Sequence, residues 1–389
     1  MNNIIPLSLH ELHQSLGARF THVNGAEVVL DYGDPQAEHS ALRASAGIFD
    51  LSFRSRLCLT GADRVRFLHG QVTNDVKKLG VGEGCYAALV TAKGKMVGDL
   101  NIFALQDEML LDFEPGLTQT VTERLEKYIV ADDVQVVNVA PYYGLLSVQG
   151  PNAESVVRAL GLFGAVPVKE FDSVNISDTT QGEIYLMNHP RLAGSEGFLS
   201  SRSCDTMDRR DGAVPGTTGF DLFVPTNSVG AVADKVIAAA KSFGGRLCGW
   251  TAFETARIES GIPRFGVDMD ETNIPLECGI EARAVSYNKG CYIGQEIINR
   301  IHSIGHVNRE LVGLRIADNA KALPVTGDKL FQMGKQVGHV TSAVDSPTLK
   351  AILVLGYVRR EASAIGTELV LRTPRWESSA KLEKLPFAK

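Results

Sequence analysis

After residue 306 the chain changes to short runs rich in strand-forming residues, and this change constrains the fold more than any other feature. The runs cover residues 309–316, 327–333, 335–343, 349–358 and 366–372. Turn residues separate them at intervals of roughly ten, which predicts a small antiparallel barrel or sandwich. We therefore expect a domain boundary within residues 302–307 and a separate C-terminal domain over residues 305–389.

Residues 1–304 combine helical and strand-like patterns and predict an α+β fold. Leucine, valine and isoleucine recur every fourth residue from 117 to 129, which is typical of an amphipathic helix. With the strand-like runs around it, this helix makes residues 51–142 a compact α+β unit. We expect that unit to be inserted into a discontinuous subdomain of residues 1–50 and 143–304. Residues 189–217 are rich in Gly, Ser, Arg and Asp and predict a long exposed loop.

Composition excludes several classes of function. The 389 residues carry a formal net charge of −6 and a pI near 5.9, which argues against nucleic acid as a direct partner. No apolar run is long enough to cross a membrane, and the N-terminus lacks the features of a signal peptide, so a cytoplasmic protein is expected. The six cysteines form no C-x-x-C pair and predict neither a metal site nor a disulfide framework: Cys58, Cys85, Cys204, Cys248, Cys278 and Cys291.

Two aspartates lie within apolar strand-like runs. In KMVGDLNIF, alternation places Asp99 on one face with Val97, Asn101 and Phe103. Asp221 in GFDLFVP similarly shares a face with Phe223. A solvated sheet face explains either aspartate, and so does a polar island that binds a ligand; the patterns favour the solvated face slightly.

Arg257 and the segment NKGCYIGQEI are two further candidates. Arg257 shares a helix face with Trp250 and Phe253, so it either pairs with Glu254 or binds an anion at a cleft edge. In the segment, Lys289 precedes Cys291 by two residues, and a nearby ammonium lowers a thiol pKa. A buried, inert cysteine is the alternative, and is the more common on chemistry alone.

The chain resembles the folate-binding superfamily of the glycine cleavage T-protein, an aminomethyltransferase. The resemblance rests on the segment RIESGIPRFGVDMDETNIPLECGIEARAVSYNKGCYIGQE and on AGIFDLS, RFLHGQVTNDV, SVQGP, GFDLFVP and LKAILVLGYV. It covers nearly the whole chain and is weakest over residues 160–215. KGCYIGQE is similar to the signature of the YgfZ-like branch, formed here by Lys289, Gly290, Cys291, Tyr292, Gly294, Gln295 and Glu296 with the intervening isoleucine.

The resemblance implies an α+β, multi-domain cloverleaf of the aminomethyltransferase folate-binding fold, with a C-terminal antiparallel β-barrel and tetrahydrofolate in a central hole. By position it implies that Asp221 grips the pteridine, where T-proteins usually carry Glu, and that Arg257 contacts the folate tail. Asp99 matches one of two paired aspartates of the T-protein strand, and Gly98 occupies the other position. One aspartate of that pair is implicated in aminomethyl transfer. Asp99 and Cys291 are therefore the candidate catalytic residues.

These residue types suit the chemistry of a folate. One carboxylate accepts both N–H donors on the edge of a pteridine, and a guanidinium matches the carboxylates of the glutamate tail. A carboxylate near the folate nitrogens can move a proton or stabilise an iminium-like cation during one-carbon transfer.

Three functions follow from the resemblance. The YgfZ-like signature and the lone Asp99 favour a tetrahydrofolate-binding protein that maintains iron–sulfur proteins, and through them tRNA modification, with little glycine-cleavage activity. Iron–sulfur enzymes or assembly proteins would then be its partners. The alternatives are a folate-dependent aminomethyltransferase or demethylase, and a non-catalytic scaffold that binds a protein.

We predict that Asp221→Ala weakens tetrahydrofolate binding by about 1–3 kcal/mol, the usual result of leaving a buried donor unpaired. Arg257→Ala should weaken the binding of polyglutamylated folate at least as much. Isothermal calorimetry measures both effects, and a pure wild-type protein that binds no folate would contradict the site and the family role together.

Overall fold

The computed structural model describes residues 4–192 and 218–387. These residues form two compact units, which are treated separately below. Unit 1 contains residues up to 87, 98–192 and the described residues up to 253, and unit 2 contains residues 88–97 and those from 254 onward. No helix in the described part of the chain is both long and apolar enough to cross a membrane.

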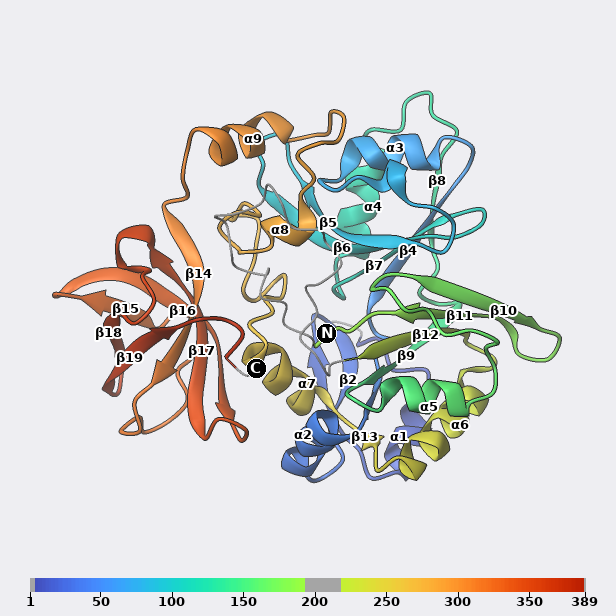
Figure 1. The fold of residues 1–389 in the computed structure, drawn as a ribbon, viewed down its shortest axis with the longest axis horizontal. Coiled ribbons are helices and arrows are strands. Elements are labelled where there is room, and N and C mark those ends of the chain that lie inside the picture. The colour runs from blue at the N-terminus through green and yellow to red at the C-terminus, as the bar shows by residue number, and fades with distance from the viewer. Residues whose placement is uncertain (1–3, 193–217, 388–389) are drawn as a thin grey trace. The chain divides into compact units, whose positions relative to one another are not determined.

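A six-stranded sheet with two helices on one face forms the larger core of unit 1. Its strand order is β10 (Ser173–Asp178), β11 (Gly182–Asn188), β12 (Gly219–Pro225), β9 (Tyr143–Gln149), β3 (Gly47–Asp50) and β13 (Arg246–Leu247). Helices α5 (Ala153–Ala159) and α6 (Val229–Ser242) lie beside β9 and β12 (Figure 1). Phe220 and Leu222 of β12 point into the apolar core that these helices cover. Alternation therefore places Asp221 on the opposite face of the sheet.

A five-stranded sheet is formed by residues between 55 and 138. Its order is β5 (Gly84–Val90), β6 (Met96–Ala104), β7 (Met109–Phe113), β4 (Ser55–Thr60) and β8 (Gln135–Asn138), with α3 (Arg64–Gln71) and α4 (Thr118–Glu126) nearby in the sequence. Val121 and Leu125 of α4 are fully buried, as the four-residue spacing predicts. The helix ends at Glu126. Ile129 lies beyond it in a turn, and its N–H donates to the Glu126 carbonyl.

The C-terminal residues form a closed antiparallel barrel, which resolves the alternative between barrel and sandwich (Figure 1). The strands run in the order β14 (Arg309–Ile316), β17 (Ala351–Arg359), β16 (Lys335–Ser346), β15 (Lys329–Gln332), β18 (Glu368–Arg372) and β19 (Glu377–Glu383). Leu369 and Leu371 of β18 face the barrel core, whereas Val370 between them is exposed. The α+β class and the terminal barrel expected from the sequence are confirmed.

The remaining helices and strands connect these layers. They are α1 (His10–Ser15), β1 (Arg19–Val23), β2 (Ala26–Asp31), α2 (Pro35–Ala44), η1 (Val76–Lys78), α7 (Trp250–Glu259), α8 (Glu281–Ala284), α9 (Gln295–Ser303) and η3 (Arg360–Ala362). Unit 2 takes in residues 88–97 and 254–308 as well as the barrel. The domain boundary at residue 305 stays a prediction.

Candidate functional site

Asp221 lies at the centre of β12 and is completely buried, so it is not on a solvated sheet face. Its Oδ2 atom accepts hydrogen bonds from Nδ1 of His189 at 2.9 Å and from Nε of Arg191 at 2.8 Å. Burial by itself would raise the pKa of this carboxyl, but the charge of Arg191 and the hydrogen bonds from His189 and Arg191 together outweigh it, so the pKa is lowered. Asp221 is therefore an anion at neutral pH.

His189 and Arg191 are buried residues that the sequence did not identify. They follow β11, at the start of the stretch that was expected to be an exposed loop; the prediction is wrong here, and residues 193–217 lie outside the described residues. Burial and the charge of Arg191 lower the pKa of His189, which is therefore neutral. Because a carboxylate can only accept, the ring proton is assigned to Nδ1. The motif N-H-P-R, a polar turn directly after a half-buried strand, gave no signal of burial.

A second set of buried charges comes from the five-stranded sheet. Asp112 of β7 accepts from Nη2 of Arg191 at 2.8 Å, from Nε of Arg54 at 2.8 Å and from Asn101 at 3.0 Å. Arg54 also donates to Glu114 at 2.8 Å. Burial favours the neutral form of Asp112, but Arg191 and Arg54 outweigh it and lower its pKa. An aspartate in the apolar run MLLDF was the signal in the sequence that could have identified Asp112.

Asp99 lies on the same face of the five-stranded sheet as Asn101, because the two are separated by one residue of β6. Asn101 is paired with Asp112, and the same antiparallel register continued outward puts Glu114 across from Asp99. Burial, and then the charge of Glu114, raise the pKa of Asp99 to about 6. The hydroxyl of Tyr86 donates to Oδ2 of Asp99 at 2.9 Å and partly offsets this increase.

Asp99 and Asp221 each have one carboxylate oxygen without a hydrogen-bond partner among the described residues. Among the described residues no group donates a hydrogen bond to Oδ1 of either side chain, although both oxygens are buried. A buried acceptor without a donor is unfavourable unless a ligand or water supplies one. Since Oδ2 of Asp221 is already engaged, a pteridine edge would meet mainly Oδ1 rather than both oxygens of this carboxylate.

Arg257 belongs to unit 2, and its guanidinium is saturated by protein groups. It donates to both carboxylate oxygens of Glu254, to Asp268 at 2.5 Å, to Ser342 at 2.8 Å and to the Ile262 carbonyl. The pairing with Glu254 that was weighed as an alternative is thus present. Through its hydrogen bond to Ser342, Arg257 also links α7 to β16. Contact with a folate tail would have to displace one of these partners, and that role stays a prediction.

The KGCYIGQE segment is a loop that ends at the start of α9. Lys289 to Gly294 precede the helix, and Gln295 and Glu296 open it. Gly294 has a φ of 89°, and a Cβ there would lie 2.6 Å from the Thr91 carbonyl oxygen, so this position requires a glycine. Cys291 and Gly290 are exposed, and Tyr292 is buried with a pKa raised to about 12 by burial.

The ammonium of Lys289 lies 4.9 Å from the centre of the Tyr292 ring. The lysine is itself buried, and the cation–π contact with this ring stabilises its positive charge. Activation of the Cys291 thiol by this lysine stays a prediction.

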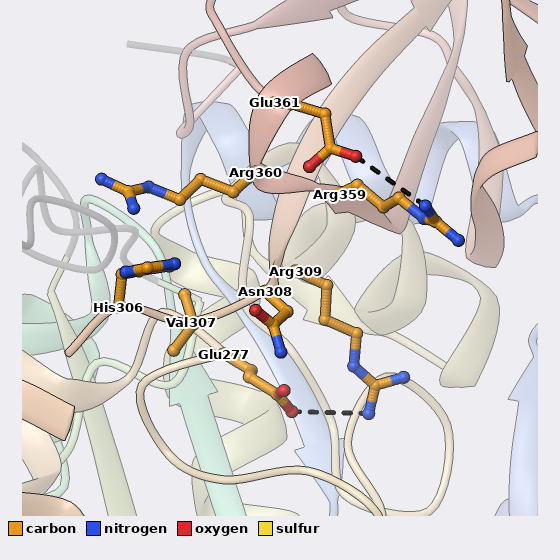
Figure 2. A pocket seen from close by; sticks show the side chains of 8 residues that line it. All are labelled: Glu277, His306, Val307, Asn308, Arg309, Arg359, Arg360 and Glu361. Carbon is orange, nitrogen blue, oxygen red and sulfur yellow. Dashed lines mark hydrogen bonds and ion pairs between the residues drawn. The ribbon is translucent and has the colours of Figure 1, made fainter.

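A pocket of about 900 Å³ lies within unit 2, but it contains none of the residues predicted from the sequence. Figure 2 shows that four of its charged side chains pair with one another, Arg309 with Glu277 at 3.4 Å and Arg359 with Glu361 at 3.8 Å. The other lining residues are His306, Val307, Asn308 and Arg360. We therefore locate the candidate site at the buried carboxylates of unit 1.

Comparison with known proteins agrees with the fold and identifies the family. The GCVT N-terminal domain matches residues 9–187 and 215–289, and the glycine cleavage T-protein C-terminal barrel domain matches residues 309–389. The chain belongs to the glycine cleavage T-protein family. Aminomethyltransferases of this family use tetrahydrofolate. The comparisons support the family but do not distinguish the YgfZ-like branch within it.

Relatives over the full length are named aminomethyltransferases. The chain is 30% identical to that of Halalkalibacterium halodurans, over 100% of this chain and 99% of the relative. It is 28% identical to that of Bacillus subtilis, over 98% of both. Its fold is like that of the glycine cleavage system aminomethyltransferase T from Bartonella henselae, with a TM-score of 0.84, 24% identity and coverage of 99% and 98%. The names favour the aminomethyltransferase alternative over iron–sulfur maintenance, which no comparison shows.

We predict that Asp99→Asn stabilises the protein at pH 8 but not at pH 4. The pKa of Asp99 is raised from 3.8 to about 6 on folding, so its ionisation increasingly destabilises the folded state as the pH rises through this range. An asparagine carries no charge at either pH. Thermal denaturation at the two pH values measures the effect, with the exposed Asp107→Asn as a control. Equal melting temperatures of Asp99→Asn and wild type at pH 8 would contradict the raised pKa.

We predict that Cys291 is alkylated faster than any buried cysteine. Cys291 is exposed, whereas Cys58, Cys248 and Cys278 are buried, and burial raises the thiol pKa of the first two. Peptide mapping after brief treatment of the native protein with iodoacetamide measures the order, and Cys291→Ser is the control for assignment. Protection of Cys291 while Cys58 reacts would remove the functional interpretation of this thiol.

Proposed function

We propose that this protein is a tetrahydrofolate-dependent aminomethyltransferase of the glycine cleavage type. The observation that carries the proposal is that the half-buried Asp99 and the fully buried Asp221 each have one buried oxygen that accepts no hydrogen bond from the described residues. Their environments differ, since one pKa is raised to about 6 and the other is lowered. Such separation is typical of sites in which two carboxyl groups have different roles.

The ionised Asp221 suits the binding role. It remains charged across neutral pH and offers Oδ1 to an N–H donor of the pteridine, in a site where a charge-assisted hydrogen bond is strong. Phe223 lies on the same face of β12 and is buried, so it provides apolar surface next to the carboxylate. Aromatic and apolar walls with a few placed polar groups are typical of cofactor sites.

Asp99 suits the transfer step. A folate nitrogen forms a bond to the aminomethyl carbon carried on a lipoyl sulfur, a second folate nitrogen bonds to the same carbon, and the carbon releases ammonia and the dihydrolipoyl thiol. The two protons that the folate nitrogens lose end on the released sulfur and on the ammonia. A group at the site must first accept the proton of the attacking nitrogen. A carboxyl group with a pKa of about 6 is ionised at pH 7 and able to accept that proton, and its charge stabilises the iminium-like carbon.

A second candidate function is the maintenance of iron–sulfur proteins by a folate-binding protein of the YgfZ-like branch. The exposed Cys291 in KGCYIGQE and the glycine at position 98 favour it. Iron–sulfur enzymes or their assembly proteins would then be the partners of the chain. Transfer activity distinguishes the two functions, because the second requires folate binding but no turnover of an aminomethylated carrier.

We predict that the protein transfers the methylene group from an aminomethylated lipoyl carrier protein to tetrahydrofolate. The rate should fall below about pH 6 as Asp99 becomes protonated, and Asp99→Asn should lower kcat by about 10²–10⁴-fold, the usual contribution of a general base. Formation of methylenetetrahydrofolate measures the rate, and the exposed Asp107→Asn is the matched control. A wild-type protein that binds tetrahydrofolate but gives no turnover would support the second candidate instead.

A further inference from the structure

Arg191 joins the two polar sheet faces of unit 1, and neither the binding role nor the transfer step described above uses it. Its side chain is 5% exposed, and Nη2 lies 2.8 Å from Asp112 and 2.7 Å from Asp221. We infer that Arg191 is a positioning residue for folate binding, which fixes Oδ2 of Asp221 and so directs Oδ1 toward the ligand. This inference rests on the proposed function and assigns Arg191 to its binding site.

The hydrogen bonds to Asp221 converge on a single oxygen. Nε of Arg191 and Nδ1 of His189 both donate to Oδ2, and Nη2 of Arg191 lies within ion-pair distance of the same atom. An aspartate side chain has only two torsions, so fixing one oxygen also fixes the direction of the other. The orientation matters more for an aspartate than for a glutamate, since the aspartate has one methylene less with which to reach a ligand.

The guanidinium is itself held from the other side. Asp112 engages Nη2 of Arg191, and Arg54 and Asn101 hold Asp112 in turn. Arg191 therefore links Asp112 of β7 to Asp221 of β12, so the position of one strand constrains the side chain on the other. Arg191 directs two donors, Nε and Nη2, at Oδ2 of Asp221, and the single ammonium of a lysine cannot replace both.

Arg191 also provides the permanent positive charge that keeps Asp221 ionised. The charged and titratable groups that contact Asp221 are Arg191 and His189. Asp112 lies on the other side of Arg191, where Arg54 also pairs with it. His189 is neutral because burial and the charge of Arg191 lower its pKa. Without Arg191 the effect of burial on Asp221 would dominate, and a protonated carboxyl is a weaker acceptor for the pteridine donors.

The test is the pH dependence of tetrahydrofolate binding, measured by calorimetry under anaerobic conditions at pH 6 and pH 8. The variants are Arg191→Met, Arg191→Lys and Arg56→Met. Arg56 is a matched control, because its guanidinium is buried, as is that of Arg191, but donates to the carbonyls of Ser52, Ala140 and Tyr143 rather than to Asp221. Asp99 and the ligand ionise in the same way in every variant. The change in wild-type affinity between pH 6 and pH 8 therefore serves as the reference for the variants.

Arg191→Met should bind tetrahydrofolate more weakly, and the loss should be larger at pH 6 than at pH 8, because burial raises the pKa of Asp221 once the guanidinium is removed. Arg56→Met should lower the melting temperature without adding a pH dependence. Arg191→Lys should restore the pH dependence of the wild type but bind more weakly at both pH values, because one ammonium cannot replace both the Nε and the Nη2 contacts with Asp221. It keeps the inference testable should Arg191→Met fail to fold.

Each contrary result has a distinct meaning. A loss of affinity in Arg191→Met that is equal at both pH values, as in Arg56→Met, would overturn the positioning role and leave the proposed function intact. Wild-type affinity in Arg191→Lys would also overturn it. Absence of tetrahydrofolate binding by the wild-type protein would overturn the proposed function, and the inference with it.

Discussion

The ion pairs of one buried guanidinium determine how the candidate site is built. Arg191 lies between Asp112 and Asp221, and removing any one of these charges from water alone would cost several kcal/mol. Each charge must therefore meet an opposite charge at hydrogen-bond distance, and Arg54 repeats the arrangement between Asp112 and Glu114. A slip of β7 or β12 by one residue would turn its aspartate to the apolar face. The charges thus fix the register of the strands that carry the functional groups.

The same network gives two aspartates different pKa values. Asp221 touches Arg191 directly and stays ionised, whereas Asp99 has Tyr86 as its donor, is desolvated and lies near the charge of Glu114, so its pKa rises to about 6. One residue type therefore provides a permanent anion and a group that exchanges a proton near neutral pH. This difference supports the assignment of Asp221 to binding and Asp99 to the transfer step.

In unit 2 a buried charge also has opposite charges beside it, but here the arginine is fully occupied by protein groups. Arg257 is buried and therefore has its partners within its own unit, in Glu254, Asp268 and Ser342. Asp268 also accepts from Thr341 at 2.5 Å, so the arginine and the aspartate together hold α7 and the loop that follows it to the barrel. Cys291, in contrast, is exposed on a loop. Spacing in the sequence identified both residues, but only their burial shows that one is engaged by protein groups and the other is accessible.

The sequence by itself determined the features that depend on neighbouring residues. Period-two alternation put Asp99 with Asn101, and Asp221 with Phe223, on the correct strand faces, and the spacing of β-rich runs predicted the terminal barrel. Only the tertiary structure decided that both aspartates are desolvated and which partners they have. Arg191 is 30 residues from Asp221 and 79 from Asp112, so no local pattern links them. Periodicity reports which face of a strand a side chain occupies, whereas the compensation of a buried charge depends on what another sheet brings to that face.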